Sequence, residues 1–213
     1  MLAPVDGLGA AVGSGVLAGF GIAVPVGAVG ALIVLLGARH GWRTGCAAGL
    51  GAAVVDGVYA TVAVVAGAAL APVLVRAAEP VRWVSAAVLL VVALLLLRTS
   101  ARTADVDPRD DAATTRPGRA FLLVLAATVV NPTTVVYFVA LTTGAATTTL
   151  TTGTQRTAFV LGALVASAAW QLLLGTAGAW AGRALTGERG RRWTARVGAL
   201  VVLALAVRTA LGA

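Results

Sequence analysis

Long apolar runs alternate with short polar segments along the 213-residue chain. Several runs reach the roughly 18 residues that a helix needs to cross a bilayer. None of them carries the polar face that an outer helix of a soluble bundle would show. The pattern predicts six membrane-spanning helices, at about residues 13–38, 44–68, 83–97, 120–146, 158–182 and 197–211.

The composition agrees with this pattern. Hydrophobic residues make up 59% of the chain and charged residues only 11%, with a mean hydropathy of +0.95. A soluble domain carries about 25% charged residues. The chain is therefore expected to be an all-α integral membrane protein with one transmembrane domain over residues 1–213. Its N-terminus lacks the basic residues that open a signal peptide, so the first helix is expected to be retained.

The distribution of arginine predicts how the helices are oriented. The segments after the first, third and fifth predicted helices hold 12 of the 16 basic residues, all of which are arginine. Cytoplasmic loops are enriched in arginine and lysine. These three segments should therefore face the cytoplasm, and both termini should lie outside the plasma membrane.

Three other features limit the function classes. The arginines that give the chain its net charge of +8 lie between the apolar runs, as in membrane-protein loops, so a nucleic-acid partner is not expected. Cys46 is the single cysteine and His40 the single histidine, which argues against a disulfide and against a metal or cofactor site. The bilayer itself is the first expected partner, and whether the chain forms a homo-oligomer stays open.

Glycine is abundant, with 26 residues, and often recurs at a spacing of four. Helices in lipid associate through small residues that let their backbones approach closely. We therefore expect most of these glycines to serve helix packing, as in three sets: Gly15 and Gly19; Gly41, Gly45 and Gly49; Gly178 and Gly182.

Polar and helix-breaking residues fall near the middle of four predicted helices. They are Pro25, Asp56, the pair Asn131–Pro132 and the pair Trp170–Gln171. An aspartate at the centre of a membrane helix costs about 2.5–3.5 kcal/mol on insertion scales, so it marks a candidate functional site. The common depth of these residues predicts a site near the bilayer midplane.

The two central prolines occupy equivalent places in the two halves of the chain. Pro25 and Pro132 each lie in the first helix of a predicted three-helix half. Broken helices at matching positions are typical of transporters built from inverted repeats. We expect two such repeats, at about residues 13–97 and 120–211, joined by a cytoplasmic loop at 98–119. The alternative is a pair of ordinary proline kinks.

The groups near the predicted breaks suit the negative end of a zwitterion. A half-helix that starts after Pro132 would point its positive end into the bundle, and Thr133 and Thr134 would add hydroxyls. Gly27 would let a ligand approach the backbone after the first break. These groups suit a carboxylate.

An acid in the second helix would complete such a site. Asp56 suits an ammonium group or a proton, and Tyr59, one turn away, is placed to hydrogen-bond it. Together with the groups near the breaks, this predicts an amino-acid site. The alternative is that Asp56 makes only a structural bond between helices.

Four motifs in the same order give the chain a family resemblance. They are Pro25-Val26-Gly27; the loop Gly41-Trp42-Arg43-Thr44-Gly45 with the pattern from Gly51 through Asp56 to Tyr59; Asn131-Pro132 with Thr134; and the helix containing Gly162, Ser167 and Trp170. This series resembles the LysE/RhtB-type amino-acid exporters over nearly the whole chain. Two positions depart from the family pattern: Ala28 replaces a usual proline, and Ala166 a frequent glycine.

The resemblance implies export of amino acids or related small metabolites, coupled to protons. Asp56 would then carry the proton or contact the ammonium group. An enzyme is not expected, because neither the histidine nor the cysteine lies near the buried acid. A membrane scaffold or assembly protein that transports nothing is the remaining alternative.

Overall fold

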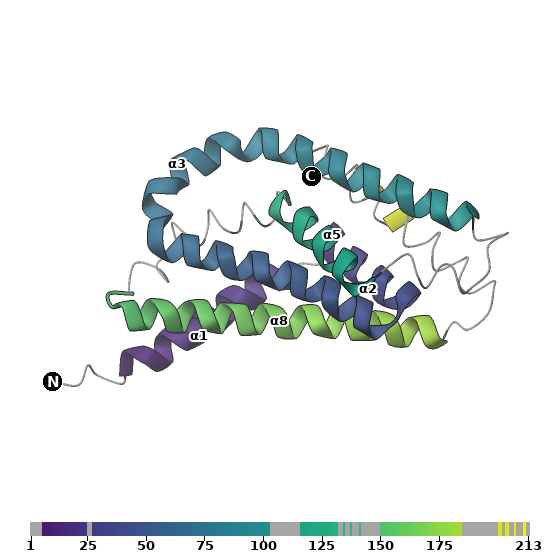
Figure 1. Ribbon diagram of the computed structural model, residues 1–213. Coiled ribbons are helices and arrows are strands. Elements are labelled where there is room, and N and C mark those ends of the chain that lie inside the picture. The colour runs from purple at the N-terminus through teal and green to yellow at the C-terminus, as the bar shows by residue number, and fades with distance from the viewer. Residues whose placement is uncertain are drawn as a thin grey trace.

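The computed structural model describes residues 6–24, 27–102, 116–131 and 150–184, and single positions at 134, 137, 141, 200, 201, 203, 204, 207 and 211. In these residues every regular element is a helix, as the sequence predicts. The helices are α1 (Asp6–Ala23), α2 (Ala28–His40), α3 (Trp42–Arg102), α5 (Pro117–Val129) and α8 (Gly153–Ala184) (Figure 1).

Two helical segments in the described part of the chain are long and apolar enough to cross a membrane, Trp42–Ala66 and Gly153–Arg183. The bent pair α1 and α2 makes a third if it is counted as one span, and α5 is a shorter apolar helix. The predicted sixth helix, at 197–211, lies mainly outside the described residues. Six spans in two inverted repeats therefore stay a prediction.

The first predicted span differs from expectation in two ways. The helix begins at Asp6 rather than near residue 13. The span is also divided into α1 and α2, which meet at an angle of 78°. The break predicted around Pro25 is thus observed, although Pro25 itself lies outside the described residues.

The prediction of a loop between the second and third helices is wrong. The sequence places Pro72, Arg76, Glu79 and Arg82 in a connection, but α3 stays helical from Trp42 to Arg102 and contains both Pro72 and Pro80. A proline removes one backbone hydrogen bond and bends a helix without having to end it. In Figure 1, α3 bends back on itself, so the reversal of direction is made by a curved helix.

Helix α8 is the centre of the packing, because α1, α2 and α3 all lie against it. Small residues make these contacts close. A Cβ atom added at Gly15 or Gly19 would overlap the α8 backbone at Phe159 or Ala163. The same holds for Gly178 and Gly182 of α8 against Val34 and Ala38 of α2. The packing role predicted for these glycines is confirmed.

Gly41 has a different role from its spaced partners. It joins α2 to α3 with a φ of +85°, a backbone conformation that favours glycine, and a Cβ atom added there would have no neighbour within 4 Å. Gly45 and Gly49 follow in α3 and do pack against α8. Gly41 therefore makes the turn that lets the two helices lie against α8 together.

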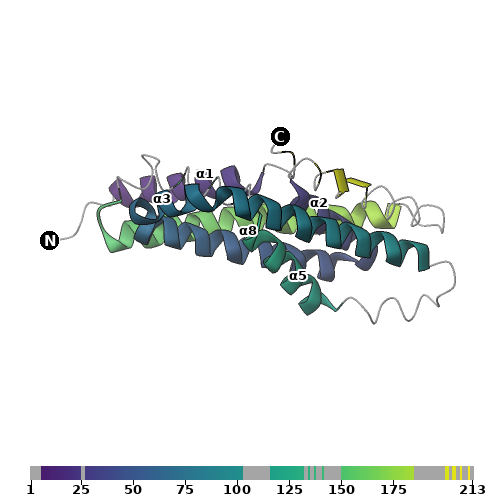
Figure 2. The same cartoon turned by 90° about the horizontal axis from the view of Figure 1, so that it is seen from above.

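The helix ends next to arginine-rich segments gather at one end of the bundle. The α2–α3 junction, the C-terminal end of α3 and the C-terminal end of α8 all lie toward the same side in Figures 1 and 2. The predicted sidedness requires this grouping. Which side of the membrane this end faces stays a prediction.

Candidate functional site

A buried hydrogen bond joins the acid of α3 to the central helix. Asp56 is only 4% exposed, and the hydroxyl of the fully buried Ser167 of α8 donates a hydrogen bond to Asp56 Oδ2 at 2.6 Å. This oxygen–oxygen distance is typical of a hydroxyl that donates to a carboxylate. The acid predicted as the centre of the site therefore lies inside the bundle, between two helices.

Close approach of the two backbones makes this contact geometrically feasible. A Cβ at Gly49 of α3 would lie 2.7 Å from the carbonyl oxygen of Gln171 of α8. From Gly49 to Asp56 the chain advances along α3, while the contact moves back along α8 from Gln171 to Ser167, so the helices are antiparallel. The glycine brings the helices close enough for a short serine side chain to reach the carboxyl.

Two buried polar atoms of α8, close to Ser167 in the sequence, have no hydrogen-bond partner among the described residues. Gln171 lies one helical turn after Ser167, is 6% exposed, and directs its side chain toward the Asp56 carboxyl. Its Oε1 atom and the indole Nε1 of the preceding Trp170 are buried and have no hydrogen-bond partner in the described part of the chain. Buried polar atoms are nearly always paired, so these two call for an explanation.

Tyr59 does not donate to Asp56 as the sequence suggested. Its hydroxyl donates to the carbonyl oxygen of Val129 at 2.6 Å. A phenol has a single proton to donate, so this bond uses it. The tyrosine thus connects α3 to the C-terminal end of α5.

The second predicted break coincides with that end. The fourth span was expected to continue to about residue 146, but α5 ends at Val129, and Asn131 turns back to donate its backbone N–H to the carbonyl of Thr128 at 3.1 Å. Pro132 and Thr133 lie outside the described residues. Thr134 is helical and 6% exposed.

The first break leaves a helix start without a side-chain cap. Gly27, the N-cap of α2, has an extended backbone and no side-chain cap bond, while its carbonyl accepts the N–H of Ala31 at 3.1 Å. The first N–H groups of a helix have no partner inside it, and they carry partial positive charge. The α2 start can therefore favour a negative group.

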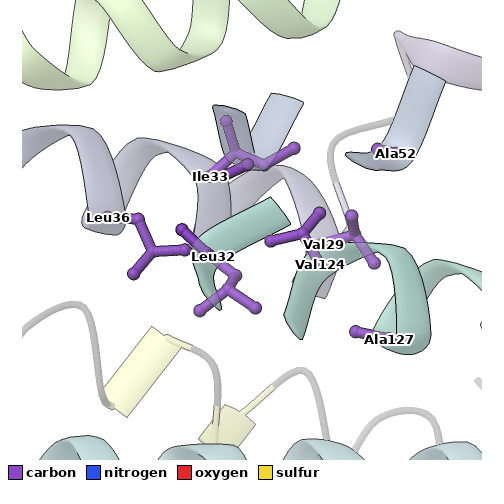
Figure 3. Close-up of a cluster of buried hydrophobic side chains, with 9 residues drawn as sticks. Val29, Leu32, Ile33, Leu36, Ala52, Val124 and Ala127 are labelled. Carbon is purple, nitrogen blue, oxygen red and sulfur yellow. The ribbon is translucent and has the colours of Figure 1, made fainter. Parts of the chain in front are cut away.

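An apolar cluster brings both breaks to the level of the acid. Val29 in the first turn of α2, Ala52 of α3 and Ala127 of α5 belong to one buried cluster (Figure 3). Ala52 lies one turn before Asp56, and Ala127 lies just before the α5 end. The start of α2, the end of α5 and the buried acid thus lie at one level of the bundle.

Two hydrogen-bonding groups of the site were not predicted from the sequence. Ser167 was noticed as part of a motif but not as a partner of Asp56, and the Val129 carbonyl was not noticed at all. A signal for Ser167 existed, because it lies one turn before Gln171 on the same helix face. No residue type signals the carbonyl, since every residue carries one.

The fold and the site define a helical membrane protein with interrupted helices around a buried acid. The chain belongs to the LysE type translocator family, whose model matches residues 20–212. The resemblance seen in its motifs is thereby confirmed. Membership makes it a membrane transporter of amino acids or related compounds, and proteins of this family are transporters rather than enzymes. No significant match to the chain was found among curated proteins or among solved structures.

Proposed function

We propose that the chain is a secondary transporter that exports amino acids or related small metabolites from the cytoplasm in exchange for protons. One observation carries the proposal: the buried Asp56–Ser167 pair lies between α3 and α8, beside a glutamine oxygen without a partner in the described residues. A purely structural pair would not need an open acceptor next to it. The interrupted helices at the same level support a site there.

In this proposal Asp56 carries the proton. A neutral carboxyl costs much less to bury than a charged one, so the acid can be covered when protonated and needs a polar partner when ionised. The hydroxyl of Ser167 serves either form, because it can donate to a carboxylate or accept from a carboxylic acid. Asp56 takes up a proton from outside and releases it to the cytoplasm.

Three groups suit the substrate. The Oε1 atom of Gln171 can accept a hydrogen bond from an ammonium group, and Nε1 of Trp170 can donate one to a carboxylate. The uncapped start of α2 at Gly27 favours the same carboxylate. A zwitterion would satisfy all three.

The direct test uses purified protein in liposomes. A mixture of isotope-labelled common amino acids is supplied, and uptake is measured by mass spectrometry with and without an imposed pH gradient. Asp56→Asn mimics the protonated acid permanently. It should insert as well as the parent, lose gradient-driven accumulation, and keep exchange of substrate for substrate. Glu79→Gln makes the same chemical change at an exposed acid of α3 and should accumulate substrate normally.

Two results would count against the proposal. An Asp56→Asn protein that accumulates substrate as the parent does would show that the proton is carried elsewhere. If the parent moves none of the labelled amino acids, with or without a gradient, export of common amino acids is refuted. The alternative would then be a scaffold that transports nothing, and such a protein should tolerate Asp56→Asn without loss of its assembly role.

The direction of transport depends on orientation. We expect the segment at 98–119 to face the cytoplasm, since it is rich in arginine. A cysteine introduced by Ala112→Cys in a Cys46→Ala background should resist an impermeant thiol reagent in intact cells and react after the cells are opened. Rapid labelling from outside would reverse the orientation and, with it, the proposed direction.

A further inference from the structure

The end of α5 leaves backbone carbonyls that the helix itself cannot satisfy. In a continuous helix the Thr128 carbonyl would accept from residue 132, but that residue is a proline and has no N–H. The backbone N–H of Asn131 bonds to the Thr128 carbonyl instead. The Val129 carbonyl accepts a hydrogen bond from the hydroxyl of Tyr59, a residue of another helix.

Tyr59 reaches this carbonyl because α3 and α5 run parallel. Gly51 of α3 lies against the backbone of Phe121 in α5, and both chains then advance by the same number of residues to Tyr59 and Val129. Lipid offers no hydrogen-bond partner to a free carbonyl, so a partner from the protein is needed at a break inside the membrane. The tyrosine supplies that partner across the helix interface.

We propose that Tyr59 is a positioning residue that ties the broken end of α5 to the helix carrying Asp56. Tyr59 lies one turn after Asp56, so the two side chains move together with α3. A rearrangement at the acid is thereby transmitted to the α5 end. This role rests on the proposed transport function, in which the breaks and the acid form one site.

The main test is Tyr59→Phe, which keeps the ring and removes only the hydroxyl. We expect the maximal exchange rate of the best-transported labelled amino acid to fall about five- to tenfold, with little change in the half-saturating concentration, because one net hydrogen bond is lost. Hydrogen–deuterium exchange should become faster at residues 126–131 and stay unchanged in α8. Tyr137→Phe makes the same change at the only other tyrosine, which is 37% exposed, and should behave like the parent.

A second variant separates positioning from stability. Adding Pro132→Ala to Tyr59→Phe restores a backbone N–H and lets the helix continue, so the Val129 carbonyl can bond within α5. Thermal stability in detergent should recover toward that of the parent, while transport should stay low because the tie to α3 is still absent. Recovery of transport in the double variant would overturn the positioning role.

Hydrogen exchange tests the tie even if the proposed function fails. A parent protein without transport activity would refute the function, while faster exchange at residues 126–131 in Tyr59→Phe would still demonstrate the tie. If Tyr59→Phe transports normally, the positioning role is wrong. If transport falls while exchange at 126–131 stays unchanged, Tyr59 acts by another route and the proposal is also wrong.

Discussion

Helix α8 packs against α1 on one side and against α3 on the other, and the two contacts differ in chemistry. Both are made close by glycine: Gly19 of α1 lies against Ala163, and Gly49 of α3 lies against Gln171. The α1 contact needs nothing more, since close packing is enough to hold helices together in lipid. The contact with α3 adds a buried acid and a serine.

Close packing explains the α1 contact but does not explain the polar groups of the α3 contact. An acid costs free energy to place in the membrane, and a buried polar group is favourable only when its partners are complete. The α1 side of α8 avoids both costs. The α3 side accepts them and still leaves Gln171 Oε1 without a partner among the described residues. We infer that the α1 contact serves the fold and that the α3 contact serves transport.

Removing the acid should have the largest effect on transport. Asp56→Ala removes the acid from the α3 contact and leaves the neutral side chains of Ser167 and Gln171 there, so the protein should still insert into the membrane. Gradient-driven accumulation should fall to the background of empty liposomes, because the proton carrier is lost. Exchange should fall with it if the carboxyl also contacts the substrate. Exchange at the parent rate would show that the carboxyl does not touch substrate.

The next largest effect concerns the α1 contact. Gly→Ala inside a helix normally stabilises it by about 1 kcal/mol. At Gly19 the added methyl group would overlap the Ala163 backbone, and overpacking of this kind costs about 1–3 kcal/mol, so Gly19→Ala should lower thermal stability. Gly21→Ala, where no atom lies within 4 Å, should leave stability equal or higher. Equal melting temperatures for the two variants would contradict this packing.

Local features of the sequence predicted much of this comparison. A lone acid in an apolar run, glycines at a spacing of four and a proline inside a helix each have a consequence that follows from one segment alone. The burial of Asp56, the packing of Gly19 and the break around Pro25 are of this kind. They could be inferred because lipid penalises a charge or an unpaired backbone group wherever it lies in the helix.

Features that depend on two distant segments could not be predicted in this way. The bond from Tyr59 to the Val129 carbonyl requires the register of α3 against α5, which no local pattern gives. The helical path through Pro72 and Pro80 does not follow from the two prolines alone, because a proline can either bend a helix or end it. The pairing of Asp56 with Ser167 needed the antiparallel approach of α3 and α8.

A smaller effect is expected at the open acceptor. Gln171→Leu replaces a buried amide by an apolar side chain of similar size, and it removes an oxygen that has no partner in the described part of the chain. The variant also removes the amide N–H that bonds to the Asp56 carboxyl, so thermal stability should change by no more than about 1 kcal/mol, the cost of this lost bond being partly offset by the removal of the unpaired oxygen. The half-saturating concentration of substrate should increase about tenfold, the equivalent of one hydrogen bond to a charged group. A marked loss of stability would instead mean that Gln171 is a structural residue.

The smallest effect should come from Ser167→Ala, which removes one hydroxyl and keeps the acid. The carboxyl loses a donor but keeps the Gln171 side chain beside it, so we expect a loss of about 1 kcal/mol in stability and a severalfold lower transport rate. Ser14→Ala is the matched control, because the Ser14 hydroxyl bonds to the Ala11 carbonyl within its own helix, on α1. That variant should transport like the parent. Equal effects of the two serine changes would remove the functional distinction between the α1 and α3 contacts.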